Sequence, residues 1–303
     1  MTTPLFDRLP HASRVLVIRI RSLGDSVLTT PAIHLLKSVR PDLRISIMSE
    51  PRFSDLFRDN PDIEAVFEPS LSAAVRFAPR LVINFHGGTR SLWLTALSLA
   101  QYRAGFVHHR AHWIYNVPIP RAQEILGEER VVHTAEHLAS AMFHLGVPHQ
   151  DIGRARLFAW PARRARAYAV LHPVAATPEK TWPADRFLRV ADNLQAHGLE
   201  PVFIGGPDDD LGAFRRFEVI AGAPLWESMS LLGGAALFVG NDSGPAHVAA
   251  AYGVPVVVLF GPSNPAIWSP WRTESRVFHS PSGIEQIRVE QVLEALESLR
   301  VFQ

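Results

Sequence analysis

The sequence contains no cysteine among its 303 residues, so disulfides and thiolate chemistry are excluded. No apolar run approaches the roughly 20 residues that a membrane-spanning helix needs. The first residues, MTTPLFDRLPHASR, lack the basic flank and long apolar core of a signal peptide. Charge is nearly balanced, with 30 basic against 29 acidic residues and a net charge of +1, which gives no electrostatic case for nucleic acid binding. We therefore expect a soluble, cytoplasmic protein.

Lysine is also scarce, because Lys37 and Lys180 are the only lysines among the 30 basic residues. Because the chain uses arginine as its usual surface cation, each of the two lysines is a candidate for a specific role. Lys180 comes shortly after a predicted strand that ends at His172, and a compact ammonium group suits a phosphate as a point charge. An ordinary surface lysine is the alternative. The G-x-G-x-x-G of dinucleotide-binding dehydrogenases is absent after the first predicted strand, which disfavours that class.

Apolar runs alternate with segments of helical periodicity along most of the chain, which predicts parallel sheets covered by helices on both faces. The predicted strands are residues 14–20, 43–48, 65–67, 81–85, 102–106, 167–171, 201–204, 237–239 and 254–260. The predicted helices are residues 27–39, 53–58, 91–99, 133–145, 183–197, 245–252 and 284–299. The pattern lapses between Gly146 and Arg166. This lapse predicts two Rossmann-like domains, 1–155 and 156–303, with an amphipathic helix closing the second.

The most informative stretch is residues 238–261, FVGNDSGPAHVAAAYGVPVVVLFG. It predicts a strand, a polar turn, an Ala-rich helix and a second strand buried on both faces. In such units a ligand lies beyond the carboxyl ends of the strands, where the helix N-terminus offers unpaired N–H groups and a partial positive charge. Gly244 lets a phosphate approach the backbone, and His247 lies one turn into the helix. The alternative is that Asp242 and Ser243 cap the helix and that His247 is a partly buried helix residue.

Asp25 occupies a similar position in the first half of the chain, after a buried strand and before a helix. The spacing alone favours helix capping, which aspartate performs well. The same place at the carboxyl end of a strand also suits a general base that deprotonates an acceptor hydroxyl. One side chain can have both roles.

Two polar clusters raise the question of a metal ion. Asp208, Asp209 and Asp210 follow Gly-Gly-Pro, which is more typical of a solvated turn than of a carboxylate metal site. His108, His109 and His112 include an i, i+4 pair, but no third ligand is evident. We therefore expect no metal. With neighbouring arginines, the histidines are instead candidates for the acceptor side of an enzyme.

The run NDSGPAHVAAAYGVPVVVLFGPSNP resembles the signature of glycosyltransferase family 9, the ADP-heptose:lipopolysaccharide heptosyltransferases. Its D-[ST]-G-x-x-H turn and Ala-rich helix are both present. The segment VLVIRIRSLGDSVLTTPAIHLLKSVRPDLRISIM is similar to the family's opening strand, Gly-Asp turn and helix. Three further segments resemble later blocks of the family: NFHGGTRSLWLTAL, residues 133–146, and HPVAATPEKTWPADRFLRVADNL. The resemblance covers most of the chain. It implies the GT-B architecture, two Rossmann-like parallel-sheet domains facing a central cleft.

The resemblance implies an inverting, metal-independent transfer of heptose from ADP-heptose to the inner core of lipopolysaccharide, with no cofactor. Asp25 is then the catalytic base in the acceptor domain. In the donor domain, the implied nucleotide-sugar-binding residues are Thr177, Lys180, Asp242, Ser243, Gly244 and His247. An acceptor bearing phosphates or carboxylates needs cations, for which the candidates are Arg21, Arg90, Arg103 and Arg110. The chain departs from the family at 175–176, where two alanines replace hydroxyl or glycine residues.

Several alternatives stay open beside this interpretation. One is a family 9 transferase with another acceptor, such as a protein hydroxyl or a different glycan. Others are an epimerase of the same fold and a catalytically silent nucleotide-sugar-binding protein. Work on lipopolysaccharide would bring the protein to the inner membrane, where a transient contact with the membrane surface is compatible with its slightly basic charge. The oligomeric state does not follow from the sequence.

Overall fold

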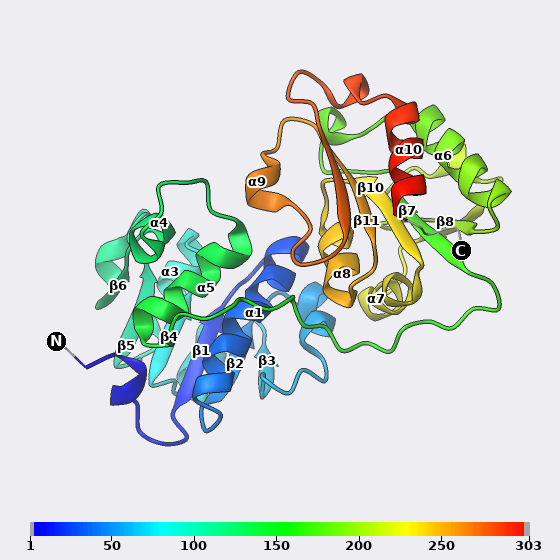
Figure 1. Cartoon of the computed structure of the whole chain (residues 1–303). Helices are drawn as coiled ribbons and strands as arrows, with labels where there is room; N and C mark the ends of the chain where they lie inside the picture. The colour runs from blue at the N-terminus through cyan, green and yellow to red at the C-terminus, as the bar shows by residue number, and fades with distance from the viewer. Residues whose placement is uncertain (1–2, 300–303) are drawn as a thin grey trace. The chain divides into compact units, whose positions relative to one another are not determined.

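The computed structural model describes residues 3–299, and contacts divide the chain into two compact units that join at Phe158 and Ala159 (Figure 1). Each unit contains one six-stranded sheet in which all paired strands are parallel. The predicted α/β class with two parallel sheets is therefore confirmed. Within residues 3–299, no helix is long and apolar enough to cross a membrane.

The first unit has the strand order β3-β2-β1-β4-β5-β6. Its strands are β1 (Arg14–Ile18), β2 (Arg44–Met48), β3 (Ala65–Phe67), β4 (Leu81–Asn84), β5 (Tyr102–Phe106) and β6 (Val117–Ile119). Its helices are α1 (Leu23–Val39), α2 (Leu71–Phe77), α3 (Thr89–Leu97), α4 (Ala122–Leu126) and α5 (Thr134–Leu145), with 3-10 turns η1 (Phe6–Arg8), η2 (Pro51–Phe57) and η3 (His112–Ile114). Helices α1 and α5 pack together, whereas Ala74 of α2 and Leu94 of α3 join a core cluster with β1, β2 and β4.

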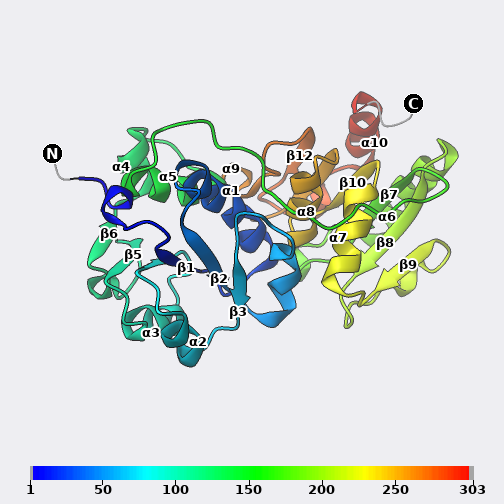
Figure 2. The same cartoon turned by 90° about the horizontal axis from the view of Figure 1, so that it is seen from below.

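The second unit has the strand order β12-β11-β10-β7-β8-β9. Its strands are β7 (Tyr168–His172), β8 (Glu200–Gly205), β9 (Glu218–Ala221), β10 (Leu237–Asn241), β11 (Val256–Phe260) and β12 (Ser275–His279). Its helices are α6 (Ala184–Ala196), α7 (Leu225–Gly234), α8 (Gly244–Tyr252), α9 (Pro265–Trp268) and α10 (Val289–Ser298), with 3-10 turns η4 (Pro178–Lys180), η5 (Gly212–Phe214) and η6 (Ile284–Gln286). Helices α6 and α10 share one apolar cluster with β7, β10 and β11, and α7 packs against α8 (Figure 2).

Both sheets have the same topology when their strands are counted in chain order. In each unit the first strand lies between the second and the fourth, which gives the doubly wound order 3-2-1-4-5-6. Connections leave the first and fourth strands in opposite directions, so a crevice opens beyond their carboxyl ends, and ligands bind there in sheets of this kind. The switch points are the ends of β1 and β4 in the first unit and of β7 and β10 in the second.

The local structure of α1 and α8 follows from a few residues. Helix α1 begins at Leu23 rather than at the predicted Val27, about one turn earlier. It contains Pro31, which has no N–H for the carbonyl of Val27, and the hydroxyl of Thr30 donates to that oxygen instead at 2.8 Å. Helix α8 ends at Gly253, whose φ of 78° is the left-handed conformation that glycine adopts without strain.

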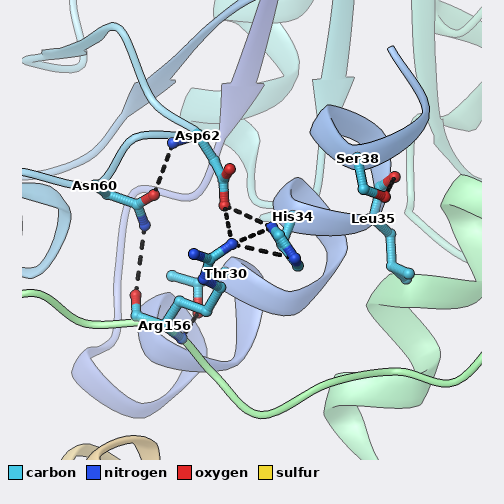
Figure 3. A network of polar contacts seen from close by, with 7 residues as sticks. All are labelled: Thr30, His34, Leu35, Ser38, Asn60, Asp62 and Arg156. Carbon is cyan, nitrogen blue, oxygen red and sulfur yellow. Dashed lines mark hydrogen bonds and ion pairs between the residues drawn. The ribbon is translucent and has the colours of Figure 1, made fainter. Parts of the chain in front are cut away.

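The segment between Gly146 and Arg166, where the sequence pattern lapses, is irregular, and Arg156 within it is held on the first unit (Figure 3). The guanidinium group of Arg156 lies 3.1 Å from the carboxylate of Asp62 and also contacts the ring of His34. The backbone N–H of Arg156 donates to Thr30 Oγ1 at 2.9 Å, and its carbonyl accepts from the side chain of Asn60 at 3.4 Å. Residue 156 is thus bound through both its side chain and its backbone.

The chain is held again directly after the junction of the two units. The carbonyl of Trp160 accepts from the Ser230 hydroxyl at 2.6 Å, and the N–H of Ala162 donates to the Ser230 carbonyl at 2.8 Å. Both contacts are within the second unit, at Ser230 in the middle of α7. Only residues 157–159 lie between the contacts of Arg156 and those of Trp160.

Candidate active site

Asp25 lies in the first turn of α1, beyond the carboxyl end of β1. Its Oδ2 accepts a hydrogen bond from the Ser22 hydroxyl at 2.9 Å, and its Oδ1 lies 3.4 Å from Nη1 of Arg19. The N-cap of α1 is Ser22, and no side chain forms a capping bond there. Capping therefore does not explain Asp25. Because 23% of its side chain stays exposed, the carboxylate remains accessible to a ligand.

Arg19 is buried directly after β1, with 8% of its side chain exposed. Burial lowers the pKa of its guanidinium group, and the nearby Asp25 carboxylate acts in the opposite direction. Its Nε has no hydrogen-bond partner among the described residues. A buried cation beside Asp25 fixes the carboxylate at the edge of the sheet. The apolar pattern places Arg19 in a predicted strand and does not reveal this role, although a charge near the end of an apolar run is a usable signal.

His86 follows β4, on the other side of the same switch point. Burial lowers the pKa of His86, and the positive charges of Arg19 and Arg21 lower it further, while a hydrogen bond with the Arg21 backbone and the charge of Asp25 raise it. The structure thus brings the loops after β1 and β4 together. The Nδ1 of His86 is buried without a hydrogen-bond partner in the described chain. The sequence pattern alone does not indicate a role for His86.

Three further histidines gather around Phe106 at the end of β5. The ring of His137 stacks on Phe106 with centroids 4.0 Å apart, and the rings of His108 and His109 lie 5.0 Å apart. Nδ1 of His109 and the Tyr115 hydroxyl are 2.8 Å apart. Burial lowers the pKa of His109 and of His137 to about 4. These two rings are therefore neutral at pH values near 7 and supply no positive charge to an acceptor.

The four candidate acceptor arginines differ in their surroundings. Arg21 lies beside His86, and the charges of Arg19 and Asp25 also act on His86. The guanidinium groups of Arg90 and Arg103 donate hydrogen bonds to backbone carbonyls of the first unit. Arg110 is exposed in the turn before η3. Of the four, the contacts described place Arg21 nearest to the proposed base.

Neither polar cluster considered as a metal site forms one in the described part of the chain. Asp209 accepts from the backbone N–H of Gly206 at 2.6 Å, and Asp210 accepts from that of Gly212 at 2.8 Å, so both carboxylates stabilise turns. Among residues 3–299 there is no group of three or more His, Cys, Asp or Glu residues that could hold a metal ion.

The second unit brings its predicted residues together at the ends of β7 and β10. Nζ of Lys180, in η4, lies 3.1 Å from Oδ2 of Asp242, which directly follows β10. The hydroxyl of Ser243 shares a hydrogen bond of 3.1 Å with Nδ1 of His172, the last residue of β7. Because the Ser243 side chain bonds to His172, it does not cap α8, although Ser243 is the N-cap residue. The first-turn N–H groups therefore have no competitor from this side chain.

Thr177 and His247 flank this arrangement. Thr177 precedes η4, and its carbonyl accepts from the N–H of Lys180 at 3.1 Å and from the Thr181 hydroxyl at 3.0 Å. His247 is 5% exposed, in the first turns of α8 after Gly244. The structure therefore gathers Thr177, Lys180 and the start of α8 within one unit.

A buried frame fixes the loop that holds Lys180. The side chain of Asn241 accepts from the Trp182 N–H at 3.1 Å and donates to the Pro173 carbonyl at 2.9 Å. The indole N–H of Trp182 donates to the Ile287 carbonyl at 2.9 Å. A side chain at Gly261 would lie 2.5 Å from the Glu179 carbonyl, so only glycine permits this close approach beside Lys180. Asn241 was predicted only as part of a turn.

His172 is buried and neutral in the folded protein. Burial lowers its pKa from 6.5 to about 4, although the charge of Asp209 opposes this shift. A neutral ring can accept a hydrogen bond from the Ser243 hydroxyl at Nδ1, whereas a protonated ring cannot. From the sequence, His172 is predicted only as the end of a strand.

Acidification should destabilise the protein through His172, by about 2 kcal/mol between about pH 7.5 and about pH 5. The folded pKa of His172 is lowered from 6.5 to about 4, so the unfolded chain binds more protons between these values. The contribution of His172 to folding stability is therefore fully present above about pH 6.5 and is lost as the pH falls toward 4. Thermal unfolding of the wild type and of His172→Asn at both pH values measures the effect. An equal loss in both proteins would show that His172 is not responsible.

Two doubly wound parallel sheets, each with polar residues at its switch point, define an α/β protein of the GT-B glycosyltransferase type. The sequence model of Glycosyltransferase family 9 (heptosyltransferase) matches residues 80–295. The chain belongs to this family. The predicted family and the predicted glycosyltransferase class are thus confirmed.

Known relatives agree with this assignment. Lipopolysaccharide heptosyltransferase 3 of Escherichia coli (strain K12) is 28% identical over 291 residues, which cover 83% of each chain. The crystal structure of the glycosyl transferase family 9 from Veillonella parvula has a TM-score of 0.86 at 24% identity, covering 95% of this chain and 97% of that one. E. coli ADP-heptose lps heptosyltransferase II has a TM-score of 0.80 at 19% identity, covering 94% and 98%. The structural likeness confirms the predicted fold.

Proposed function

We propose that the protein transfers a heptosyl group from ADP-heptose to the inner core of lipopolysaccharide, with inversion at the anomeric carbon. Family membership supports heptosyl transfer, and relatives named for ADP-heptose and for lipopolysaccharide support the donor and the acceptor. The observation with most weight is that Lys180 and Asp242 meet beside the N-terminus of α8. An ammonium group and a helix N-terminus at a switch point suit a diphosphate.

On the donor side, Lys180 is the cation for the diphosphate of the leaving ADP. The N–H groups at Ser243 and Gly244 and the ring of His247 are the partners for its phosphate oxygens. Asp242 then lies nearer to the transferred sugar, and Thr177 lines the loop before η4. Fixed dipoles and one ammonium group stabilise the charge that develops on ADP without rearranging as the bond breaks.

On the acceptor side, Asp25 is the general base. The acceptor hydroxyl oxygen attacks the anomeric carbon while the bond from that carbon to the ADP oxygen breaks, and the hydroxyl proton passes to the Asp25 carboxylate. Ser22 and Arg19 hold that carboxylate in place, at 2.9 and 3.4 Å. Arg21 is the cation for an anionic acceptor in this loop, and Arg90, Arg103 and Arg110 are more distant candidates. The first unit thus serves the acceptor, and the second serves the donor.

The test is mass spectrometry of the protein mixed with ADP-heptose, UDP-sugars or GDP-sugars, with and without a heptose-deficient lipopolysaccharide core. The expected result is a heptose-sized mass gain on the acceptor with ADP-heptose alone. Transfer from a UDP- or GDP-sugar would overturn the proposed donor. If no sugar nucleotide is consumed, the proposed catalysis is wrong, and calorimetry with ADP shows whether the protein is a silent binder. A changed sugar nucleotide formed without any acceptor would identify an epimerase.

A second acceptor class, a protein hydroxyl or a glycan with fewer anionic groups, has support from one observation. On the predicted acceptor side, His109 and His137 are neutral, and the guanidinium groups of Arg90 and Arg103 keep their charge but use some of their donors on backbone carbonyls. An acceptor rich in phosphates would require more cations. Consumption of ADP-heptose only with a neutral glycan or a protein acceptor would favour this alternative.

A further inference from the structure

The segment from 69 to 123 contains no aspartate or glutamate, although the whole chain has 29 acidic residues among 303. The same segment contains six arginines and four histidines. Arginine is about as frequent in this segment as in the chain as a whole, but without acidic residues its six arginines give it a formal net charge of +6, against +1 for the whole chain. The segment includes α2, α3 and η3.

Large apolar side chains are exposed in the same segment. These side chains, with their exposed fractions, are Leu71 (40%), Val75 (40%), Trp93 (59%), Leu97 (46%), Leu99 (82%) and Trp113 (78%). They make up more than half of the large hydrophobic residues that are exposed in the described chain. Exposed apolar side chains that cluster mark an interaction surface more often than scattered ones do.

The elements that bear these side chains pack side by side. Leu92 and Ala96 of α3 pack against Ile114 and Tyr115, at and after η3. Helix α2 packs against α3, and the two lie next to each other in Figure 2. The inner sides of α2 and α3 join the sheet core, so their outer sides face away from it.

The outer sides of these elements form a surface that we call the basic apolar face. It consists of Leu71, Val75 and Arg76 of α2, Arg90, Trp93 and Leu97 of α3, Arg110 in the turn before η3, and Trp113 of η3. On α3, residues 90, 93 and 97 recur at the spacing of one helix face. Every charged residue of the face is an arginine.

We propose that the basic apolar face docks on an anionic lipid bilayer. Tryptophan and leucine side chains enter the boundary between headgroups and acyl chains, while arginines beside them contact lipid phosphates. A carboxylate in this segment would be repelled by anionic lipid, and none is present. This proposal does not depend on the proposed sugar transfer.

Two other occupants fit the face less well. A second copy of the chain would place arginines against arginines, and this like-charge contact opposes association. Single-stranded nucleic acid also uses arginines and aromatic rings, but it stacks its bases on aromatic platforms. Trp93 and Trp113 could serve as such platforms, but Leu71, Val75 and Leu97 could not, whereas all five side chains suit insertion into lipid.

The test is co-sedimentation of the full chain with phosphatidylcholine vesicles, with and without phosphatidylglycerol, and without donor or acceptor. The protein should bind only the anionic vesicles, and binding should weaken as salt rises. Trp93→Ser with Leu97→Ser should lower the affinity about tenfold or more. Arg76→Glu should lower it at least about fivefold. Because these side chains are exposed, thermal unfolding and ADP affinity should not change.

Matched controls come from the second unit. Trp160 is 87% exposed and the side chain of Arg166 is 78% exposed, so Trp160→Ser and Arg166→Glu remove the same groups elsewhere. Both controls should bind vesicles like the wild type. Equal binding to neutral vesicles, or no loss in the Trp93 and Leu97 variant, would overturn the proposal. A dimer in light scattering that the Trp93 and Leu97 variant abolishes would also overturn it. Binding to single-stranded RNA in place of vesicles, if the same variant abolishes it, would overturn it as well.

Discussion

Asp25→Asn should lower the rate of sugar transfer by about a hundredfold to ten-thousandfold, which is the range for loss of a general base. The amide keeps the shape of the side chain and can still accept from the Ser22 hydroxyl, but it cannot take the acceptor proton. Affinity for ADP should stay unchanged, because the proposed donor residues lie in the second unit. Initial rates of ADP release in the presence of acceptor, with calorimetry of ADP binding, measure both effects.

The stability of this variant needs a control because Asp25 neighbours the buried guanidinium group of Arg19. A buried charge that loses its partner destabilises a protein by several kcal/mol, about 3 to 5 in measured cases. The double variant Arg19→Met with Asp25→Asn removes both charges, so it should fold while still lacking transfer activity. Ser22→Ala removes only one hydrogen bond and should retain most activity. Transfer at a near wild-type rate by any folded variant without Asp25 would show that the base lies elsewhere.

Lys180→Met should weaken ADP binding between about tenfold and a hundredfold, the expected effect of losing one hydrogen bond to a charged group. The loss has two causes: the cation for the diphosphate disappears, and the Asp242 carboxylate at 3.1 Å loses its partner. An unpaired carboxylate at this place repels phosphate. Isothermal titration calorimetry with ADP measures the change directly.

The chain provides a matched control, since Lys37 is its only other lysine. The ammonium group of Lys37 donates to the carbonyls of Pro41 and Leu43 in the first unit, each at 2.8 Å. Lys37→Met should leave ADP affinity unchanged. Lys180→Met with Asp242→Asn should regain part of the lost affinity if repulsion contributes. Unchanged ADP affinity in the Lys180 variant would remove this residue from the donor site.

Central strands were predictable from the sequence, whereas three of the four edge strands were not, and only the edge strand β3 was predicted, at its observed residues 65–67. Strands such as β1, β4, β10 and β11 are buried on both faces and therefore appear as continuous apolar runs. The edge strand β12 alternates between exposed and partly buried residues, and β6 and β9 are similarly short or exposed, so none of the three has that signature. The short helices α2, α4 and α9 were also missed. The helix predicted over 284–299 is divided in the structure into η6 and α10. The apolar spacing does not reveal this break before Val289.

The candidate site was predictable where its residues are neighbours in the sequence. Asp242, Ser243 and Gly244 could be placed at one helix N-terminus from the turn sequence alone. The pairing of Lys180 with Asp242, and of His172 with Ser243, joins residues that are 62 and 71 positions apart. Such pairs depend on which strands are neighbours in the sheet, and single-sequence patterns do not determine this order.

The repeated strand order of the two units has an evolutionary consequence. In both units the connection after the first strand carries a charged group with a proposed role, the carboxylate of Asp25 in one and the ammonium group of Lys180 in the other, on the same scaffold. The difference between the proposed acceptor and donor roles then resides in a few loop positions rather than in the architecture. Substitutions in the loops of one unit leave the core of the other untouched. Selection for a new acceptor can therefore proceed while the nucleotide preference is inherited unchanged.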